Sequence, residues 1–182
     1  MEYSKFKEIF NKSIFEKSKI DLLEKVAKSP ERYVGIFRPT KPKAKIIQNL
    51  SQSHEIRFGD AFEKLIEEYF RSKGWEILNK KFVAQDGNNL MIDQCFKVGE
   101  KVFFIEQKVR DDHDSTKKRG QITNFGKKLD IMLKTYGEDN LVDIFYFIDP
   151  SLSKNKKFYT DELKKITSDY GIETQLFYGE EL

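Results

Sequence analysis

The chain has 182 residues, of which 38% are hydrophobic, 35% charged and 14% aromatic. This length predicts one domain with a substantial core, and the 16 Phe and 8 Tyr exclude a disordered chain, because aromatic side chains supply the burial that offsets chain entropy. The sequence holds no apolar run of about 18 residues, which excludes a membrane span, and its one cysteine excludes an internal disulfide or a multi-cysteine zinc site. The N-terminal segment lacks the apolar core of a signal peptide, so we expect a cytoplasmic protein.

The formal net charge is only +3, but the charges are unevenly distributed. Basic residues gather at 38–45, 79–81, 115–121 and 154–157, whereas acidic residues concentrate in "EKLIEEYF" and "YGEEL". A mildly basic total with separated charges suits a protein with one polyanion-binding face. The simpler alternative is a solvated, lysine-rich surface.

The first 74 residues predict helices. Apolar residues at helical spacing indicate one or two helices over 3–27, and four proline and glycine residues indicate an irregular basic connector over 29–45. A strong amphipathic helix is expected to open at 51 and to end at Gly74. Its apolar stripe consists of Phe58, Phe62, Leu65, Ile66, Tyr69 and Phe70.

The remaining residues alternate strand and helix signals. We predict a strand over 75–84, and a hairpin that joins 88–98 to 101–109 around Gly99. A helix over 115–137, a buried strand over 141–150, a short helix over 160–171 and a last strand over 173–179 follow. This order predicts an α/β fold with a mixed central β-sheet flanked by helices.

The predicted hairpin carries charged residues that suggest chemistry. Side chains alternate across a strand, so Glu106 and Lys108 share one face, and a turn within 97–101 brings Asp93 opposite Glu106. Two adjacent carboxylates repel unless a cation lies between them, and oxygen ligands favour Mg²⁺. We therefore predict a metal site for phosphodiester hydrolysis, in which Lys108 has an electrostatic and positioning role.

These residues resemble the PD-(D/E)XK nucleases. Asp93 matches the first acid and Glu106-Gln107-Lys108 matches the (D/E)XK triplet, although Ile92 replaces the usual proline before the first acid. The resemblance implies a restriction-endonuclease-like core over 51–182, within a single nuclease domain over 1–182 that has an N-terminal helical and basic extension over 1–50.

The resemblance extends to the neighbouring helices. "RFGDAFEKLIEEYF" is similar to the helix that precedes the core hairpin in these nucleases, with Glu63 as the best match to its acidic residue and Glu67 as the alternative. The implied metal ligands are Asp93, Glu106, Glu63 and the backbone carbonyl of Gln107.

The segment "VRDDHDSTKKRGQITNFGKKL" resembles the basic loop and helix of type II restriction endonucleases. Its polar side chains are of the kinds that contact phosphates or base edges. We predict DNA contact by Arg110, His113, Lys117, Lys118, Arg119 and Gln121. The alternative is a solvated loop that caps the next helix through Asp114 or Ser115.

Other residues offer rival assignments. Asp86 is a rival first acid, but the Asp–Gly pair favours a turn. The loop acids Asp111, Asp112 and Asp114 could hold a metal, although strands position ligands more rigidly than loops. Cys95 is expected to be a small buried residue.

The resemblance implies a Mg²⁺-dependent type II restriction endonuclease that cuts double-stranded DNA at a short sequence. It implies one or two metal ions, with Mn²⁺ as a substitute, a homodimer and a companion DNA methyltransferase. A repair or junction nuclease of the same superfamily is one alternative, and a non-catalytic DNA-binding domain is another.

Overall fold

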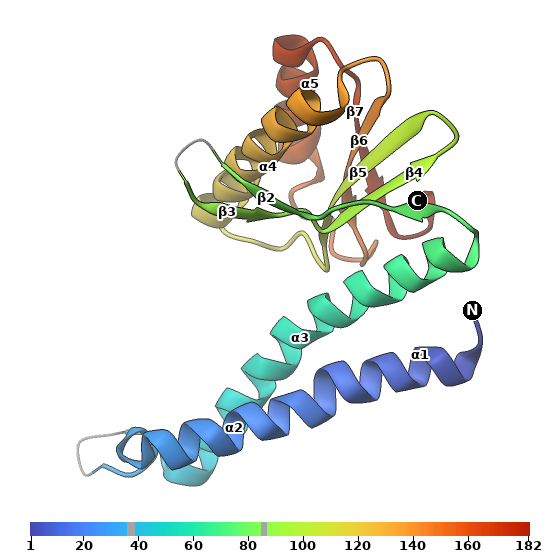
Figure 1. Ribbon diagram of the computed structural model, residues 1–182. Coiled ribbons are helices and arrows are strands. Elements are labelled where there is room, and N and C mark those ends of the chain that lie inside the picture. Colours follow the sequence, from blue (N-terminus) through green and yellow to red (C-terminus); the bar gives the residue numbers. More distant parts are fainter. Residues whose placement is uncertain (36–38, 85–86) are drawn as a thin grey trace. The chain divides into compact units, whose positions relative to one another are not determined.

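The computed structural model describes residues 1–35, 39–84 and 87–182. The chain forms two compact units, Met1–Tyr69 and Phe70–Leu182, and helix α3 (Pro42–Ser72) runs through the boundary between them (Figure 1). The predicted extension over 1–50 lies within the first unit, and the organisation as a single domain stays a prediction. Among the described residues, no helix combines the length and apolarity needed to cross a membrane.

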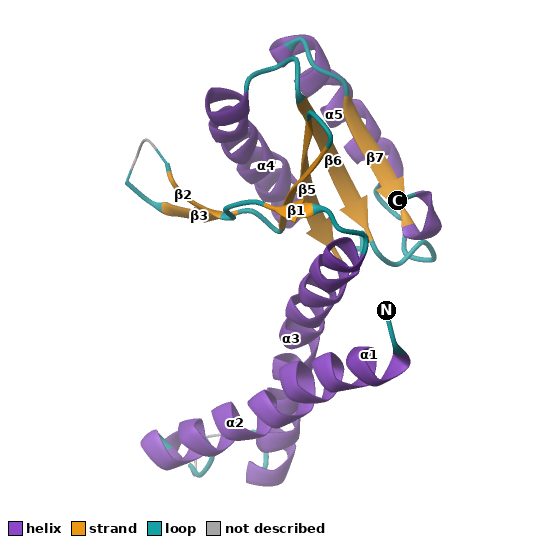
Figure 2. Ribbon diagram, turned by 45° about the vertical axis from the view of Figure 1, so that its right-hand side comes forward, coloured by secondary structure: helices purple, strands orange, loops and turns teal. Residues whose placement is uncertain are grey.

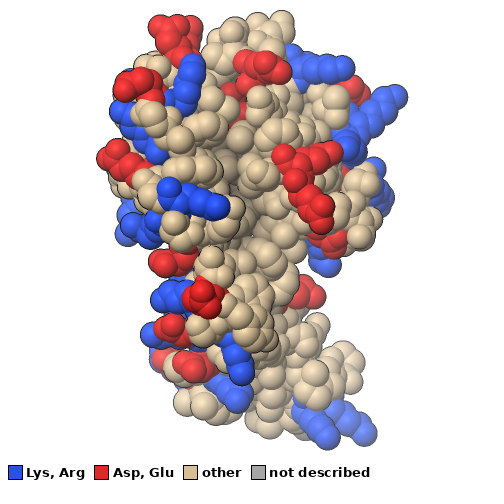
Figure 3. Space-filling view, turned by 90° about the vertical axis from the view of Figure 1, so that its right-hand side faces the viewer, with Lys and Arg blue, Asp and Glu red and all other residues tan. Residues whose placement is uncertain are grey.

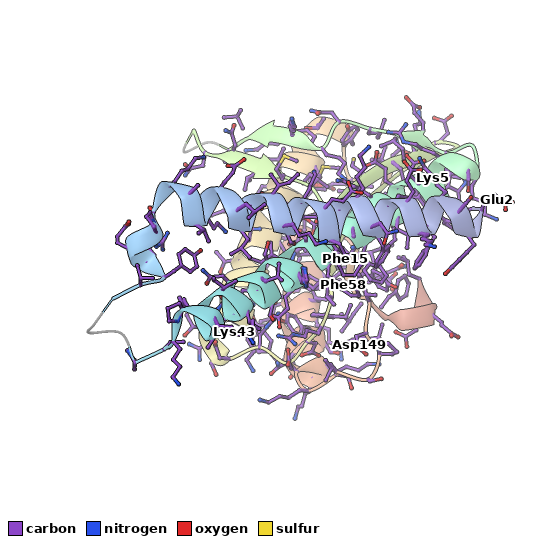
Figure 4. The ribbon with its side chains drawn as sticks, turned by 90° about the horizontal axis from the view of Figure 1, so that it is seen from below. Glu2, Lys5, Phe15, Lys43, Phe58 and Asp149 are labelled. Atoms are coloured by element: carbon purple, nitrogen blue, oxygen red, sulfur yellow. The ribbon has the colours of Figure 1, made fainter. Side chains whose placement is uncertain are left out.

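The first unit is helical, as predicted. Its elements before α3 are α1 (Tyr3–Phe10), a π-helical segment η1 (Asn11–Glu16), α2 (Lys17–Lys28) and a 3₁₀ turn η2 (Pro30–Arg32). Phe10 packs edge-on against Phe58, with ring centroids 5.7 Å apart, and Phe15 packs in the same way against His54. Figure 4 labels Phe15 on the N-terminal helical segment and Phe58 on α3. Aromatic contacts thus hold the N-terminal helical segment against α3.

Helix α3 begins earlier than the sequence indicated. Residues 42–45 belong to the helix and not to the connector, because Pro42 occupies the first helical position, where the missing N–H would have no helical partner anyway. The helix ends at Ser72, and Gly74 follows as the predicted stop: its φ is +76°, and its N–H donates to the Arg71 carbonyl at 3.0 Å.

The second unit is built on a five-stranded mixed sheet, which confirms the predicted α/β class (Figure 2). Its order is β1 (Glu76–Ile77), β4 (Gln94–Val98), β5 (Lys101–Lys108), β6 (Leu141–Phe147) and β7 (Thr174–Tyr178). The pairs β1–β4 and β4–β5 are antiparallel, whereas β5–β6 and β6–β7 are parallel. The predicted hairpin is β4–β5, with Gly99 at φ +58° in its turn.

Two predicted strands are each divided in two. The segment 75–84 forms β1 and β2 (Lys81–Val83), and the segment 88–98 forms β3 (Asn89–Met91) and β4. The cause is that β2 and β3 leave the main sheet to pair with each other. Asp93 therefore lies in the bend between β3 and β4, and not on a strand as predicted.

Helices α4 (Ser115–Tyr136) and α5 (Lys156–Tyr170) cover one face of the sheet (Figures 1 and 2). Phe125 of α4 and Tyr159 of α5 both pack against Phe145 of β6, with ring centroids 5.3 and 5.2 Å away. On the opposite face, Phe96 stacks on Trp75 at 5.2 Å. The strongly apolar strand β6 is therefore buried in the centre of the unit, as its sequence indicated.

Candidate active site

Asp93 is tied to strand β5 through its own side chain. The β4–β5 ladder ends at the pair Gln94–Ile105, and beyond it the Asp93 Oδ2 atom accepts the backbone N–H of Gln107 at 2.8 Å. A carboxylate oxygen thus takes the place of the next ladder carbonyl. This bond holds the first acid opposite the (D/E)XK triplet.

Strand alternation divides the triplet between the two faces of the sheet. Glu106 and Lys108 turn toward Asp93, and Lys108 Nζ lies 3.1 Å from Asp93 Oδ2 and 2.7 Å from Glu106 Oε1. Gln107 turns the other way, where its Oε1 atom accepts a hydrogen bond from Gln94 Nε2 at 3.4 Å. The structure therefore brings together Asp93, Glu106 and Lys108, while their catalytic roles stay predictions.

The electrostatics of the cluster keep Lys108 charged. Burial alone would lower the pKa of its ammonium, but the Glu106 and Asp93 carboxylates outweigh burial and raise the pKa above its ordinary value. Glu106 itself is only 1% exposed, so its charge is compensated by neighbouring groups and hardly by water. This supports an electrostatic role for Lys108 and argues against a free general base.

One member of the cluster, Lys128 on α4, was not predicted from the sequence. Its side chain is buried, and its Nζ atom lies 2.5 Å from Glu106 Oε2 and 3.3 Å from Asp93 Oδ1. The available signal was its spacing, since it stands at i+3 from Phe125 and is followed directly by Leu129, two inward positions of the helix. A lysine in an apolar stripe must find an acid on the surface that the helix covers.

The donor atoms of this cluster fit a hard divalent cation. One oxygen from each acid approaches the same ammonium nitrogen, so both carboxylates can reach a single cation. Two carboxylates match what Mg²⁺ takes from proteins when waters and phosphates complete its shell. The described residues contain no group of three or more His, Cys, Asp or Glu arranged to hold a metal.

The other two predicted ligands have different positions. The Gln107 carbonyl lies at the cluster, where it accepts a hydrogen bond from Lys108 Nζ at 3.0 Å. Glu63 and the alternative Glu67 lie on α3 within the first unit, and their part in the site stays a prediction.

The loop acids have structural partners. Asp111 is fully buried and accepts hydrogen bonds from the Tyr178 hydroxyl at 2.6 Å and the Asn155 backbone N–H at 2.8 Å. Asp114 caps α4 by accepting the backbone N–H groups of Thr116 and Lys117, both at 2.9 Å. These contacts favour Asp93 and Glu106 over the loop acids as metal ligands.

The six predicted DNA-contacting residues lie in the loop after β5 and the first turns of α4, but they differ in accessibility. Arg110, Lys117 and Arg119 are exposed. Lys118 Nζ donates a hydrogen bond to Asn155 Oδ1 at 3.0 Å, and Gln121 Oε1 accepts a hydrogen bond from the hydroxyl of the buried Tyr159. The exposed three are therefore the better placed for phosphate contact.

The sixth residue, His113, is partly buried. Its burial and the nearby Lys117 charge lower its pKa below the ordinary value. Its backbone carbonyl accepts a hydrogen bond from Asn155 Nδ2 at 3.1 Å. The imidazole is therefore neutral near pH 7, which limits what it can add to phosphate attraction.

Two further sequence-based assignments concern Cys95 and Asp86. Cys95 is buried as predicted, and burial raises the pKa of its thiol to about 11, so it is not a reactive thiolate. The rival first acid Asp86 lies outside the described residues.

The face drawn in Figure 3 is not marked by surface charge. On the face drawn in Figure 3, basic and acidic side chains are intermingled, and no single basic stripe is visible among the described residues there.

The mixed sheet, with Asp93, Glu106 and Lys108 at the end of β5, has the arrangement of a PD-(D/E)XK nuclease. The family model of HinfI, a type II restriction endonuclease, matches residues 2–86 and 76–182. The chain belongs to this family of type II restriction endonucleases, and it is thus a site-specific deoxyribonuclease that binds DNA and uses divalent metal ions. Comparisons with curated proteins and with solved structures gave no match.

Proposed function

We propose that the enzyme hydrolyses phosphodiester bonds of double-stranded DNA with Mg²⁺ held by Asp93 and Glu106. One observation carries the proposal: the Lys108 ammonium contacts both carboxylates, at 3.1 and 2.7 Å, on one surface at the end of a rigid strand. In a cluster of two acids and a lysine, the carboxylates can hold a cation and the ammonium can attract a phosphate.

The residues divide the work between them. When bound, the ion polarises the scissile phosphate and lowers the pKa of a coordinated water. Asp93 and Glu106 orient the reacting centre, because Glu106 lies on β5 and the Asp93 side chain is tied to the same strand through the Gln107 N–H. Lys108 stays protonated and stabilises the negative charge that develops on the phosphate oxygens.

The remaining ligands and partners extend this proposal. Glu63 and the Gln107 carbonyl complete the shell of one or two ions, and Mn²⁺ can replace Mg²⁺. The exposed basic residues at the start of α4 contact the DNA backbone. The enzyme acts as a homodimer, since two-fold symmetry matches a palindromic site, and a companion DNA methyltransferase protects the host.

Cleavage of plasmid DNA tests the proposal directly. The purified enzyme is incubated with DNA and Mg²⁺, then with EDTA, and the same is done for Asp93→Asn and Lys108→Met. We expect discrete fragments from the wild type with Mg²⁺ only, and none from either variant while DNA binding persists. Wild-type cleavage by Asp93→Asn would refute the assigned site.

Glu63→Gln tests the fourth ligand. We expect a smaller loss of cleavage than for Asp93→Asn, because Glu63 supplements the two hairpin acids. A larger loss would mean that Glu63 is the principal acid and Asp93 the auxiliary one.

A further inference from the structure

Lys128 is an unusual residue for the inner face of a helix. It is 4% exposed and lies among the buried Phe125, Leu129 and Met132 of α4. Removing an ammonium group from water is unfavourable by several kcal/mol unless strong partners replace the water. Here the partners are Glu106 Oε2 and Asp93 Oδ1, and they are the two acids proposed to hold the metal ion.

The four charged groups form a closed set. Each carboxylate has one oxygen near Lys108 and the other near Lys128. Two negative and two positive charges sum to zero, so the two lysines offset the attraction of the carboxylates for a divalent cation.

The Lys128 ammonium also lies where an ion would be expected. Asp93 Oδ2 is engaged with the Gln107 N–H, which leaves Oδ1 as the oxygen free of backbone bonds. That oxygen and Glu106 Oε2 converge on Lys128 Nζ. An ion held by the same pair of oxygens would compete with this ammonium for space and for ligands.

We propose that Lys128 is an internal competitor for the metal ion: its ammonium neutralises Asp93 and Glu106 in the metal-free enzyme and gives up these contacts when a divalent cation binds. The inference depends on the proposed metal site. Its consequence is that the DNA-free enzyme binds the ion weakly, and that DNA phosphates, which add negative charge, strengthen ion binding.

The test measures metal binding without DNA. Mn²⁺ affinity is determined by calorimetry and by electron paramagnetic resonance for the wild type and for Lys128→Met, which keeps the length of the side chain and removes the charge. Lys134→Met is the matched control, because Lys134 is an exposed lysine on the same helix. We expect Lys128→Met to bind Mn²⁺ about tenfold or more tightly than the wild type, and the control to bind like the wild type.

Thermal unfolding gives a second readout. In EDTA, Lys128→Met should unfold at a lower temperature than the wild type, and Mn²⁺ should raise its unfolding temperature more than that of the wild type. Unchanged or weaker Mn²⁺ binding by Lys128→Met would overturn the proposal.

The wild-type enzyme offers a test that needs no variant. The ¹H–¹⁵N signals of its lysine ammonium groups are recorded by NMR in EDTA and at saturating Mg²⁺. A protected ammonium signal must shift or disappear when Mg²⁺ binds, and unchanged ammonium signals would overturn the proposal. This measurement decides the matter even where Lys128→Met does not fold.

The two proposals fail in different ways. If Asp93→Asn loses both cleavage and Mn²⁺ binding while Lys128→Met binds Mn²⁺ like the wild type, the proposed role of Lys128 is wrong and the proposed metal site stands. If Asp93→Asn keeps cleavage and Mn²⁺ binding, the metal site is wrong, and the competitor with it.

Discussion

Two buried acids near the end of β5 are held in contrasting ways. Glu106 is 1% exposed and meets the ammonium groups of Lys108 and Lys128. Asp111 is fully buried and accepts hydrogen bonds from neutral donors, the Tyr178 hydroxyl and the Asn155 backbone N–H. Only five positions separate them in the sequence (111 − 106 = 5).

The difference separates the acid proposed to hold the metal ion from a structural one. Burial and the Asp111 charge raise the pKa of Tyr178, so its hydroxyl keeps its proton and remains a donor. Neutral donors fixed by the fold cannot be exchanged for a metal ion without leaving buried groups unsatisfied. An ammonium on a flexible side chain can be exchanged, because the incoming cation supplies the same charge.

The largest effect on cleavage is expected at Glu106, the acid whose partners are ammonium groups. Glu106→Gln keeps the shape of the side chain and removes the charge proposed to bind the ion, so cleavage should fall by about a thousandfold or more, as for the loss of a principal electrostatic contact. Single-turnover cleavage of plasmid DNA measures this, and an anisotropy assay should show retained DNA binding.

Glu138→Gln is the control for this substitution, because Glu138 is an exposed acid in the loop before β6. It should cleave like the wild type. Equal activity of the two variants would remove the distinction between Glu106 and an ordinary surface acid.

The next effect concerns the structural acid. Asp111→Ala leaves two buried donors unsatisfied, and the free energy of unfolding should fall by roughly 2–4 kcal/mol. Urea unfolding followed by fluorescence measures this. The folded fraction should still cleave DNA at a rate close to that of the wild type, and a variant that is stable but inactive would place Asp111 in the chemistry instead.

A third buried acid, Asp143 on β6, has neither kind of partner. Its carboxylate oxygens have no partner within hydrogen-bonding geometry among the described residues. Burial raises its pKa from 3.8 to about 6, and the nearby Thr174 hydroxyl and its own backbone N–H offset this only in part. The folded chain therefore binds more protons than the unfolded chain between about pH 4 and 6, and this group's contribution to stability falls as the pH rises through that window.

Asp143→Asn should remove this pH dependence. Its gain in the free energy of unfolding over the wild type should be small near pH 4 and should grow by up to about 3 kcal/mol above pH 6. Urea titrations at several pH values measure the difference. A difference that does not vary with pH would contradict the origin of the effect in the Asp143 carboxyl group.

The smallest effect separates two neighbouring lysines. Lys117 is exposed, whereas Lys118 contacts Asn155 Oδ1 and lies over the Phe158 ring at 4.4 Å. Lys117→Ala should weaken binding to any duplex a few-fold and reduce the salt slope by about 1. Lys118→Ala should lower stability more than DNA affinity. Anisotropy titrations at several salt concentrations and urea unfolding measure both, and the opposite pattern would reverse the assignment.

The sequence predicted the features of the fold that depend on local patterns. Strand alternation and Gly99 indicated the β4–β5 hairpin, and an apolar run indicated β6. The break before Asp93 was missed because it depends on the pairing of β2 with β3, a contact that no local pattern encodes. The start of α3 was missed because Pro42 was taken as a helix breaker although it occupies a first helical position.

The candidate site shows the same limit. Alternation along β5 was enough to bring Glu106 and Lys108 to one face. Lys128 follows Glu106 by 22 residues (128 − 106 = 22) and reaches it only through the packing of α4 on the sheet. The apolar stripe of the helix predicts that Lys128 points inward, but it does not predict that Glu106 is its partner.

The two carboxylate oxygens of Asp93 have different partners. Oδ2 accepts the Gln107 N–H in the place of a ladder carbonyl, and Oδ1, which contacts Lys128 Nζ, is the oxygen proposed to hold the metal ion. An asparagine can reproduce the first task but cannot supply a charged ligand for the second. One residue therefore both fixes the bend to β5 and supplies the proposed metal ligand. A change of one atom, from Asp93 to asparagine, can remove the ligand while the bend keeps its position.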